Sequence, residues 1–372
     1  MKIGYDAKRA FHNTSGLGNY SRDLLRILFK HRPEQEYFLF NPKASKRELF
    51  QYERNERIHE IMPSSPLHQI IHPIWRSKAV IGECKSRKLD IYHGLSNELP
   101  IGIGKSKIKS IVSIHDLIFM RLPKLYRKTD RLIYRAKFEQ ACKEADKIIA
   151  ISEQTASDII KYLKISSSKI EVVHQGCQPE FQKEHSTQSL EKVKEQYSLP
   201  DRFLLGVGTL EKRKNQGIII RAMAELKENI PLVLVGKPTS YKIQLQKLSD
   251  ELGLSGMIHY LSDVPTEDLA RIFKLAEVLL YPSVFEGFGI PILEGLSSGI
   301  PVVTSEDSCF HEAGGNAALY INPYEHRSLV KALEEILNDE RSRMERIEAG
   351  KEHFQNFSED KIANNLSAVY DI

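Results

Sequence analysis

The feature that most constrains this chain is the alternation of short apolar runs with amphipathic segments of helical period. Segments 18–29, 130–145 and 153–163 each place apolar residues on one helical face. Between such segments lie apolar runs that predict strands at 2–6, 36–40, 89–94, 108–116 and 147–152. This order predicts an α/β fold with a parallel sheet that is covered by helices on both faces.

The alternation stops in the stretch 178–201, which holds one short charged helix and lacks a strand, so we expect a linker there. It resumes with apolar runs at 202–208, 231–236, 257–261, 277–282 and 301–305. A chain of 372 residues also exceeds one ordinary core. We therefore expect two doubly wound, Rossmann-like domains, at 1–177 and 202–355. The last helix, within 356–372, is compatible with either domain.

Charge and composition exclude several classes of protein. The 53 basic and 49 acidic residues leave a net charge of +4, and the basic residues are dispersed, which disfavours a nucleic-acid partner. No apolar run approaches the ~18–20 residues that span a bilayer. The N-terminus, MKIGYDAKRAF, reads as a first strand, so we expect a cytoplasmic protein whose four separated cysteines are free thiols.

Two cations follow the apolar run 202–208, in the sequence GTLEKRKN that begins at Gly208. In open α/β sheets, ligands bind beyond the carboxyl ends of the strands. Arg213 and Lys214 stand there, just before an expected helix, and cations beside a helix N-terminus suit a phosphate group. A solvated basic turn is the alternative.

The run SVFEGFGIPILEG follows the apolar run 277–282 and carries two glutamates, Glu286 and Glu294. Gly287 and Gly289 let the backbone approach a ligand at a helix start, which predicts a second anion site. Carboxylates accept hydrogen bonds from paired hydroxyls, so the arrangement suits a diphosphate with a sugar at each end. Otherwise Glu286 is simply exposed, and Glu294 favours the helix N-terminus.

Signals in the first half are weaker. Gly16 and Gly18, in TSGLGNY, place backbone N–H groups near a helix start, but a dinucleotide fingerprint would need a third glycine. His115 follows a strand and suits contact with a substrate hydroxyl, or a helix cap together with Asp116. His93 reads as a structural residue. The chain has no D-x-D, no HExxH and no Cys/His cluster, so we expect neither a metal nor another cofactor.

These motifs resemble the family-4 retaining glycosyltransferases. The resemblance rests on E-x7-E in FEGFGIPILEGLSSGIPVV, on GTLEKRKN and on the N-terminal glycines, and it extends through ADKIIAISEQTASDIIKYLKI, KIEVVHQG and HFQNFSEDKIANNLSAVY. It implies the GT-B fold, in which two Rossmann-like domains face each other across a cleft. It also implies an N-terminal acceptor domain, a C-terminal donor domain and a final helix, 356–372, that crosses back to the N-terminal domain.

The resemblance also implies residue roles. Glu286 would bind hydroxyls of the donor sugar, Glu294 would bind the ribose, and Arg213 and Lys214 would neutralise the diphosphate. His115 would lie near the transferred sugar. The donor would also meet the backbone at Gly18, Gly208, Gly287, Phe288 and Gly289.

The expected reaction is metal-independent transfer of a hexose from a nucleoside diphosphate sugar to an acceptor hydroxyl, with retention at the anomeric carbon. Similarity to the G-T-x-E-x-R-K-N subgroup, which is linked to surface polysaccharides, makes GDP-mannose the first choice of donor. That subgroup usually has proline at Lys212, and many family members carry arginine at Thr209. Lys212 is then an additional cation that offsets the missing arginine.

Other interpretations stay open. A nucleotide-sugar epimerase or a non-catalytic nucleotide-sugar sensor would use the same architecture. The chain would be an NAD-dependent oxidoreductase if GLGNYS were a dinucleotide-binding fingerprint. The expected acceptor is a lipid-linked or surface-polysaccharide glycan. Segment 121–140 mixes cations with Leu, Tyr and Phe, which suits peripheral contact with anionic lipid at the inner membrane face. A solvated, partly buried helix is the alternative.

Overall fold

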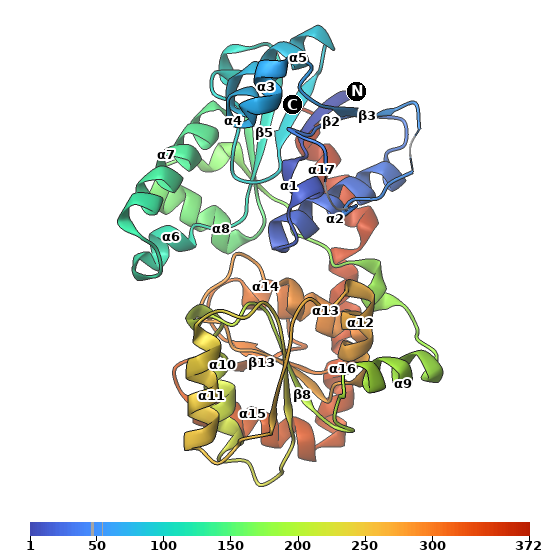
Figure 1. Cartoon of the computed structure of the whole chain (residues 1–372), viewed down its shortest axis with the longest axis vertical. Coiled ribbons are helices and arrows are strands. Elements are labelled where there is room, and N and C mark those ends of the chain that lie inside the picture. Colours follow the sequence, from blue (N-terminus) through green and yellow to red (C-terminus); the bar gives the residue numbers. More distant parts are fainter. Residues whose placement is uncertain (46–47, 54) are drawn as a thin grey trace. The chain divides into compact units, whose positions relative to one another are not determined.

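The chain forms two compact units, each with its own parallel sheet (Figure 1). The computed structural model describes residues 1–45, 48–53 and 55–372. The first unit comprises Met1–Gln175 and Ser358–Ile372, and the second comprises Gly176–Phe357. No helix in these described ranges is both long and apolar enough to cross a lipid bilayer.

The first unit is built on a seven-stranded parallel sheet with the order β3-β2-β1-β4-β5-β6-β7. Tyr5, in the interior strand β1, pairs with Leu39 on one side and His93 on the other. All seven strands run parallel, so their carboxyl ends lie along one edge. The strands are β1 Lys2–Asp6, β2 Glu36–Phe40, β3 Ile58–Ile61, β4 Ile91–Gly94, β5 Lys109–Ile114, β6 Lys147–Ala150 and β7 Ile170–Val172.

Helices supply the crossovers that a parallel sheet requires. Trp75 and Phe138 bring such crossovers into the apolar core beside strand residues such as Val112 and Ile148. The helices are α1 Lys8–His12, α2 Gly16–His31, α3 Pro66–Ile70, α4 His72–Ile74, α5 Val80–Ser86, α6 Ile118–Arg121, α7 Lys128–Glu144 and α8 Glu153–Asp158, with π-helical turns at Trp75–Ala79 and Ile159–Leu163.

The second unit has a six-stranded parallel sheet with the order β10-β9-β8-β11-β12-β13. The chain starts in the middle at β8, builds outward to β10, and then returns to the other side of β8 with β11. Ligands bind at such a switch point in doubly wound folds. The strands are β8 Leu204–Val207, β9 Leu232–Val235, β10 Ile258–Leu261, β11 Val278–Tyr281, β12 Val302–Ser305 and β13 Leu319–Ile321.

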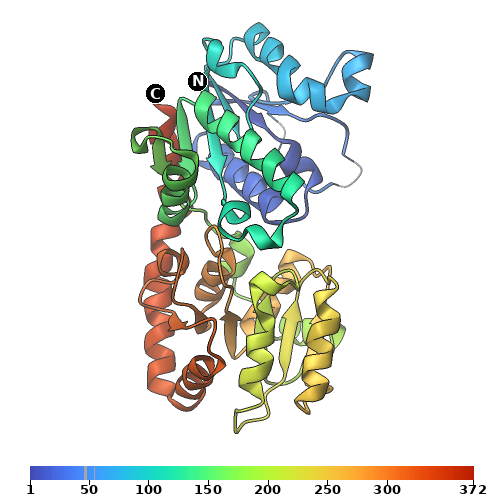
Figure 2. The ribbon, with the colours of Figure 1, turned by 90° about the vertical axis from the view of Figure 1, so that its left-hand side faces the viewer.

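Two groups of helices cover this sheet, and Figure 2 shows them from the side. Helix α10 packs against α11 and α15, whereas α13 packs against α12, α14 and α16. The helices are α9 Thr187–Gln196, α10 Gln216–Met223, α11 Tyr241–Glu251, α12 Thr266–Leu275, α13 Ile290–Ser298, α14 Phe310–Gly314, α15 His326–Asn338 and α16 Glu340–Phe354.

The segment 178–201 differs from the linker that the sequence predicted. It belongs to the second unit, where Pro179–Gln182 forms a 3₁₀ turn and α9 packs on α12. The rings of Phe181 and Phe273 pack edge to face, with their centroids 5.1 Å apart. The Tyr197 hydroxyl donates a hydrogen bond to Asp268 at 2.8 Å. Only a few apolar and hydroxyl side chains hold this segment in place. The remaining residues are polar, so the sequence carried no sign that the segment is packed.

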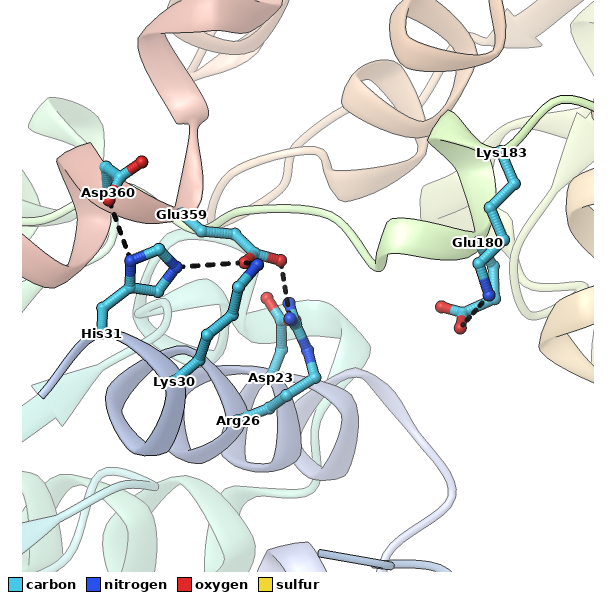
Figure 3. Close-up of polar contacts among 8 residues, drawn as sticks. All are labelled: Asp23, Arg26, Lys30, His31, Glu180, Lys183, Glu359 and Asp360. Atoms are coloured by element: carbon cyan, nitrogen blue, oxygen red, sulfur yellow. Dashed lines mark hydrogen bonds and ion pairs between the residues drawn. The ribbon is translucent and has the colours of Figure 1, made fainter. Parts of the chain in front are cut away.

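The last helix, α17 Glu359–Tyr370, lies on α2 in the first unit (Figure 3). Glu359 accepts hydrogen bonds from Arg26 at 2.6 Å and from Lys30 at 2.7 Å. The His31 ring lies between two carboxylates, with Nε2 at 3.2 Å from Glu359 and Nδ1 at 2.9 Å from Asp360. Charges that are more than 300 residues apart in sequence thus attach the C-terminal helix.

We expect Glu359→Gln to lower the melting temperature at pH 7 by about 2–6 °C, because losing these charge-assisted bonds costs about 1–2 kcal/mol. Burial alone raises the pKa of Glu359, but Lys30 and Arg26 outweigh it and lower the pKa to about 2. A lowered pKa in the folded state means that the stabilisation is present above the ordinary pKa and is lost as the pH falls towards 2. The difference between variant and wild type should therefore shrink below about pH 4.5 in thermal melts.

Glu348→Gln is the matched control, because Glu348 forms an exposed surface pair with Lys351. Such pairs contribute little, so this variant should melt within about 2 °C of wild type. Equal melting temperatures for the two variants would contradict the role given to Glu359.

Candidate functional site

The second unit brings two predicted loops together, because β8 and β11 are neighbours in its sheet. The loop after β8 carries the cations, and the loop after β11 carries the glutamate. Val284 N donates to Arg213 O at 2.8 Å, and the Asn215 side chain donates to Pro282 O at 3.2 Å. These bonds join the two loops side by side at the switch point of the sheet.

Glu286 is clamped between the two predicted cations. Its Oε2 lies 2.6 Å from Arg213 Nη1, and its Oε1 lies 2.8 Å from Lys214 Nζ. Arg213 also donates to the Phe285 carbonyl at 2.8 Å and to Glu211 at 2.6 Å. The structure therefore shows Arg213, Lys214 and Glu286 as one buried ionic cluster, and the alternatives of a solvated turn and an exposed glutamate are wrong.

The pKa values follow from this cluster. Burial on its own raises the pKa of Glu286, but Lys214 and Arg213 outweigh burial and lower the pKa to about 2. Burial lowers the pKa of Lys214, and the negative charge of Glu286 opposes that shift. Glu286 is thus fully ionised at neutral pH and acts as the counterion of both cations in the ligand-free chain.

Glu294 lies in α13 and has the opposite character. Burial raises the pKa of Glu294 to about 8, and the nearby charge of Lys214 offsets this only in part. Its carboxyl group forms no ion pair or hydrogen bond with the part of the chain that the structure describes. The group is therefore largely protonated at pH 7, and its polar atoms remain able to meet ligand hydroxyls.

The start of α13 requires glycine at one of the two positions that the sequence singled out, whereas the predicted contact with a ligand stays a prediction. Gly289 is the N-cap residue and adopts φ +121°, a conformation that L side chains rarely adopt. Gly287 and Phe288 precede it, and the Phe288 ring is buried beside Phe357. The Phe288 carbonyl accepts from Cys309 Sγ at 2.7 Å. The Phe288 side chain thus belongs to the core.

Gly208 is explained by its neighbour. It has φ +129°, and a Cβ at this position would lie 3.1 Å from Cε of Lys214. A larger residue would therefore push the lysine away from Glu286. Lys212, which the sequence suggested as a third cation, is exposed.

Gly18 and His115 belong to the first unit. A Cβ on Gly18 would lie 1.9 Å from the Asn13 carbonyl oxygen, so close packing of the loop before α2 already requires glycine there.

His115 Nε2 donates to the Leu95 carbonyl at 2.9 Å. Burial lowers the pKa of His115 to about 4, although this hydrogen bond opposes the shift, so the ring is neutral at pH 7. The rings of Tyr20 and His115 pack edge to face, with their centroids 4.5 Å apart.

Sequence reasoning did not single out two residues of the cluster. Tyr281, the last residue of β11, accepts from Lys214 Nζ at 2.7 Å. Glu211 shares the Arg213 guanidinium with Glu286. Glu211 lay inside the GTLEKRKN motif and could have been considered, whereas Tyr281 reads as one more apolar strand residue.

Family models match both halves of the chain. Residues 14–181 match the model described as Glycosyltransferase Family 4, and residues 188–353 match the model described as Glycosyl transferases group 1. HepE from Anabaena, solved in complex with UDP and glucose, has a TM-score of 0.76 at 18% identity and covers 99% of this chain and 98% of its own. The fold and the matches define the chain as a glycosyltransferase of GT-B fold.

Within that fold, the chain belongs to glycosyltransferase family 4 and resembles its mannosyltransferases. The O-antigen chain mannosyltransferase B of Escherichia coli is 28% identical over 341 residues, which is 87% of either chain. The serotype-specific mannosyltransferase WbdA of Escherichia coli is 28% identical over 263 residues. That match covers 68% of this chain but only 32% of WbdA.

We expect Glu294→Gln to stabilise the ligand-free chain by about 1–2 kcal/mol at pH 8, after allowance for its partial exposure. Glutamine resembles the protonated carboxyl group in shape. It cannot ionise, so the folded state does not have to keep a proton on this side chain at pH 8. A raised pKa in the folded state means that the stability is fully present below the ordinary pKa and is lost as the pH rises through 8. Urea unfolding at pH 5 and pH 8 should therefore show the gain mainly at pH 8.

Glu286→Gln is the matched control with the opposite sign. It leaves Lys214 without its counterion and Arg213 with Glu211 alone, so it should destabilise the chain by about 3 kcal/mol at neutral pH. The same direction of change in both variants would contradict the assignment of opposite ionisation states.

Proposed function

We propose that the chain transfers a hexose from a nucleoside diphosphate sugar to a hydroxyl of a lipid-linked or surface-polysaccharide glycan, with retention and without a metal ion. GDP-mannose is the first choice of donor. The observation that carries this proposal is the cluster of Arg213, Lys214 and Glu286 at the switch point of the second sheet. The O-antigen mannosyltransferase among the relatives supports the choice of sugar and acceptor.

The cations keep donors for a ligand while they hold Glu286. An ammonium group has three N–H donors; Lys214 donates one hydrogen bond to Tyr281 and forms an ion pair with Glu286. A remaining donor can serve a diphosphate oxygen. In the proposed reaction the bond from the anomeric carbon to the diphosphate breaks, and the acceptor oxygen bonds to that carbon. The acceptor proton passes to the leaving diphosphate, whose growing charge Lys214 and Arg213 stabilise.

The other residues would position the donor. Glu286, ionised and fixed by two cations, would accept hydrogen bonds from sugar hydroxyls and would not act as a nucleophile. Glu294 would hold the ribose hydroxyls, and the backbone of Gly287 to Gly289 would approach the phosphates. Gly18 would approach the donor, and His115 would lie near the transferred sugar, as the family resemblance implies.

Product analysis separates this proposal from its rivals. Incubation with GDP-mannose and a polyprenyl-linked glycan should yield a mannosylated product with the anomeric configuration of the donor, readable by NMR. Activity should persist in EDTA. A new sugar nucleotide formed without acceptor would indicate an epimerase, and donor binding without any turnover would indicate a sensor.

In that assay we expect Lys214→Ala to lower kcat by about 100-fold, because it removes stabilisation of the leaving group. Lys247→Ala is the control, since this lysine is exposed and pairs with the exposed Glu251 on α11, and it should stay within about twofold of wild type. Melting curves must show that both variants fold. Near-normal turnover in Lys214→Ala would contradict the assigned role.

We further propose that α7 contacts anionic lipid. Its Leu132, Ile133 and Tyr134 side chains are exposed at 69%, 53% and 41%. Arg131 and Arg135 lie on the same helix. Apolar side chains beside cations suit an interface in which anionic headgroups meet the charges.

Sedimentation with liposomes tests this contact. The chain should sediment with phosphatidylglycerol liposomes at low salt and much less with phosphatidylcholine liposomes. The variant with Leu132→Ser and Ile133→Ser should lose most of this binding and keep its melting temperature. Equal sedimentation of variant and wild type would refute the proposal.

A further inference from the structure

The carboxyl edge of the first sheet carries a cluster of charges that the proposed roles do not use. Asp6 ends β1, and Lys8 and Arg9 open α1 directly after it. Arg76 enters from the π-helical turn before α5 and donates through Nε to Asp6 at 2.8 Å. Glu98, in the loop after β4, also pairs with Arg76. The cluster thus gathers side chains from three crossovers at one edge of the sheet.

The carboxylates of this cluster are already occupied. Asp6 and Glu98 supply two negative charges, and Arg76 binds both of them. Lys137 binds Glu98 as well, at 3.0 Å. Two positive charges therefore balance the two carboxylates. In the part of the chain that the structure describes, Asp6 and Glu98 are thus both paired with cations other than Lys8 and Arg9.

Lys8 and Arg9 are further cations at this edge of the sheet. Both side chains are partly buried, and neither forms an ion pair or side-chain hydrogen bond within the described part of the chain. Arg9 Nε is shielded from solvent without a hydrogen-bond partner. Leaving a buried charged donor unsatisfied is unfavourable, so such a group in a folded protein needs an explanation.

The pKa of Lys8 is affected by the other charged side chains of this cluster. Burial lowers the pKa of Lys8, and the nearby charges of Arg76 and Arg9 lower it further. Asp6 and Glu98 act in the opposite direction but do not cancel the effect. An anion held by the Lys8 ammonium and the Arg9 guanidinium would remove this repulsion.

We propose that Lys8 and Arg9 form an anion site in the first unit that binds a phosphate or diphosphate group of a substrate. A guanidinium and an ammonium together match phosphate oxygens, and the carboxyl edge of a doubly wound sheet is where ligands bind. Two sources share this chemistry in the proposed reaction, on which the inference rests: the diphosphate of the donor and a phosphate that links the acceptor glycan to its lipid.

Calorimetric titration of the full chain with inorganic pyrophosphate tests the site itself. The double variant Lys8→Gln with Arg9→Gln should lose one binding event, or weaken it at least about tenfold, while Lys8→Arg with Arg9→Lys keeps it. Lys107→Gln removes the same charge from an exposed position of the same unit and should bind as wild type does. If the double glutamine variant does not fold, Lys8→Gln alone serves the same comparison.

Titrations with GDP and with farnesyl diphosphate in detergent then assign the source. Loss of GDP affinity in the glutamine variant identifies the donor diphosphate, and selective loss of farnesyl diphosphate affinity identifies the acceptor phosphate. Unchanged binding of all three probes would overturn the proposal. Because binding is read without turnover, a chain that binds pyrophosphate through Lys8 and Arg9 but transfers no sugar would contradict only the proposed function.

Discussion

Both sheets of this chain are entirely parallel, and a parallel strand can be reached only by a crossover that runs over a face of the sheet. That constraint determines where chemistry can be placed. The crossovers bury both faces, which leaves the edge where the strands end as the place for groups that contact a ligand. In each unit the chain starts at a central strand and later returns beside it, which brings two distant loops together. Arg213 and Glu286 meet for this reason, although 73 positions separate them.

The two carboxyl edges differ in how their charges are balanced. In the second unit the charges of Arg213 and Lys214 are compensated by Glu286 and Glu211. In the first unit Arg76 uses the available carboxylates, and Lys8 is left without one. A compensated cluster fixes geometry before the ligand arrives, whereas an uncompensated pair gains most from the ligand itself. The two clusters therefore differ in how much their cations would gain from a bound anion.

Much of the fold could be predicted from the sequence, because helical and apolar periods are local signals. The strands missing from that prediction are β3, β7 and β13, which are three or four residues long and lie in the outer part of the sheets, where exposure weakens the apolar pattern. The helix α9 was foreseen as a short charged helix, but its packing depends on single contacts such as Tyr197 with Asp268. Such tertiary contacts leave no periodic trace.

The site was only partly predictable, for a related reason. Residue types and spacing pointed to Arg213, Lys214 and Glu286, but their pairing depends on which strands are neighbours. Tyr281 was hidden because a tyrosine at the end of a buried strand looks like any apolar residue. The partner of Lys214 and the neutral state of His115 are properties of the folded environment.

The two glutamates of the E-x7-E motif also owe their properties to the folded environment. Glu286 and Glu294 are chemically identical and eight residues apart, yet one is held ionised and the other protonated at pH 7. The difference arises because Lys214 contacts Glu286 directly, whereas it reaches Glu294 only through a weaker field that does not overcome burial. Two carboxyl groups of one motif thus take opposite charge states because only one of them touches a cation.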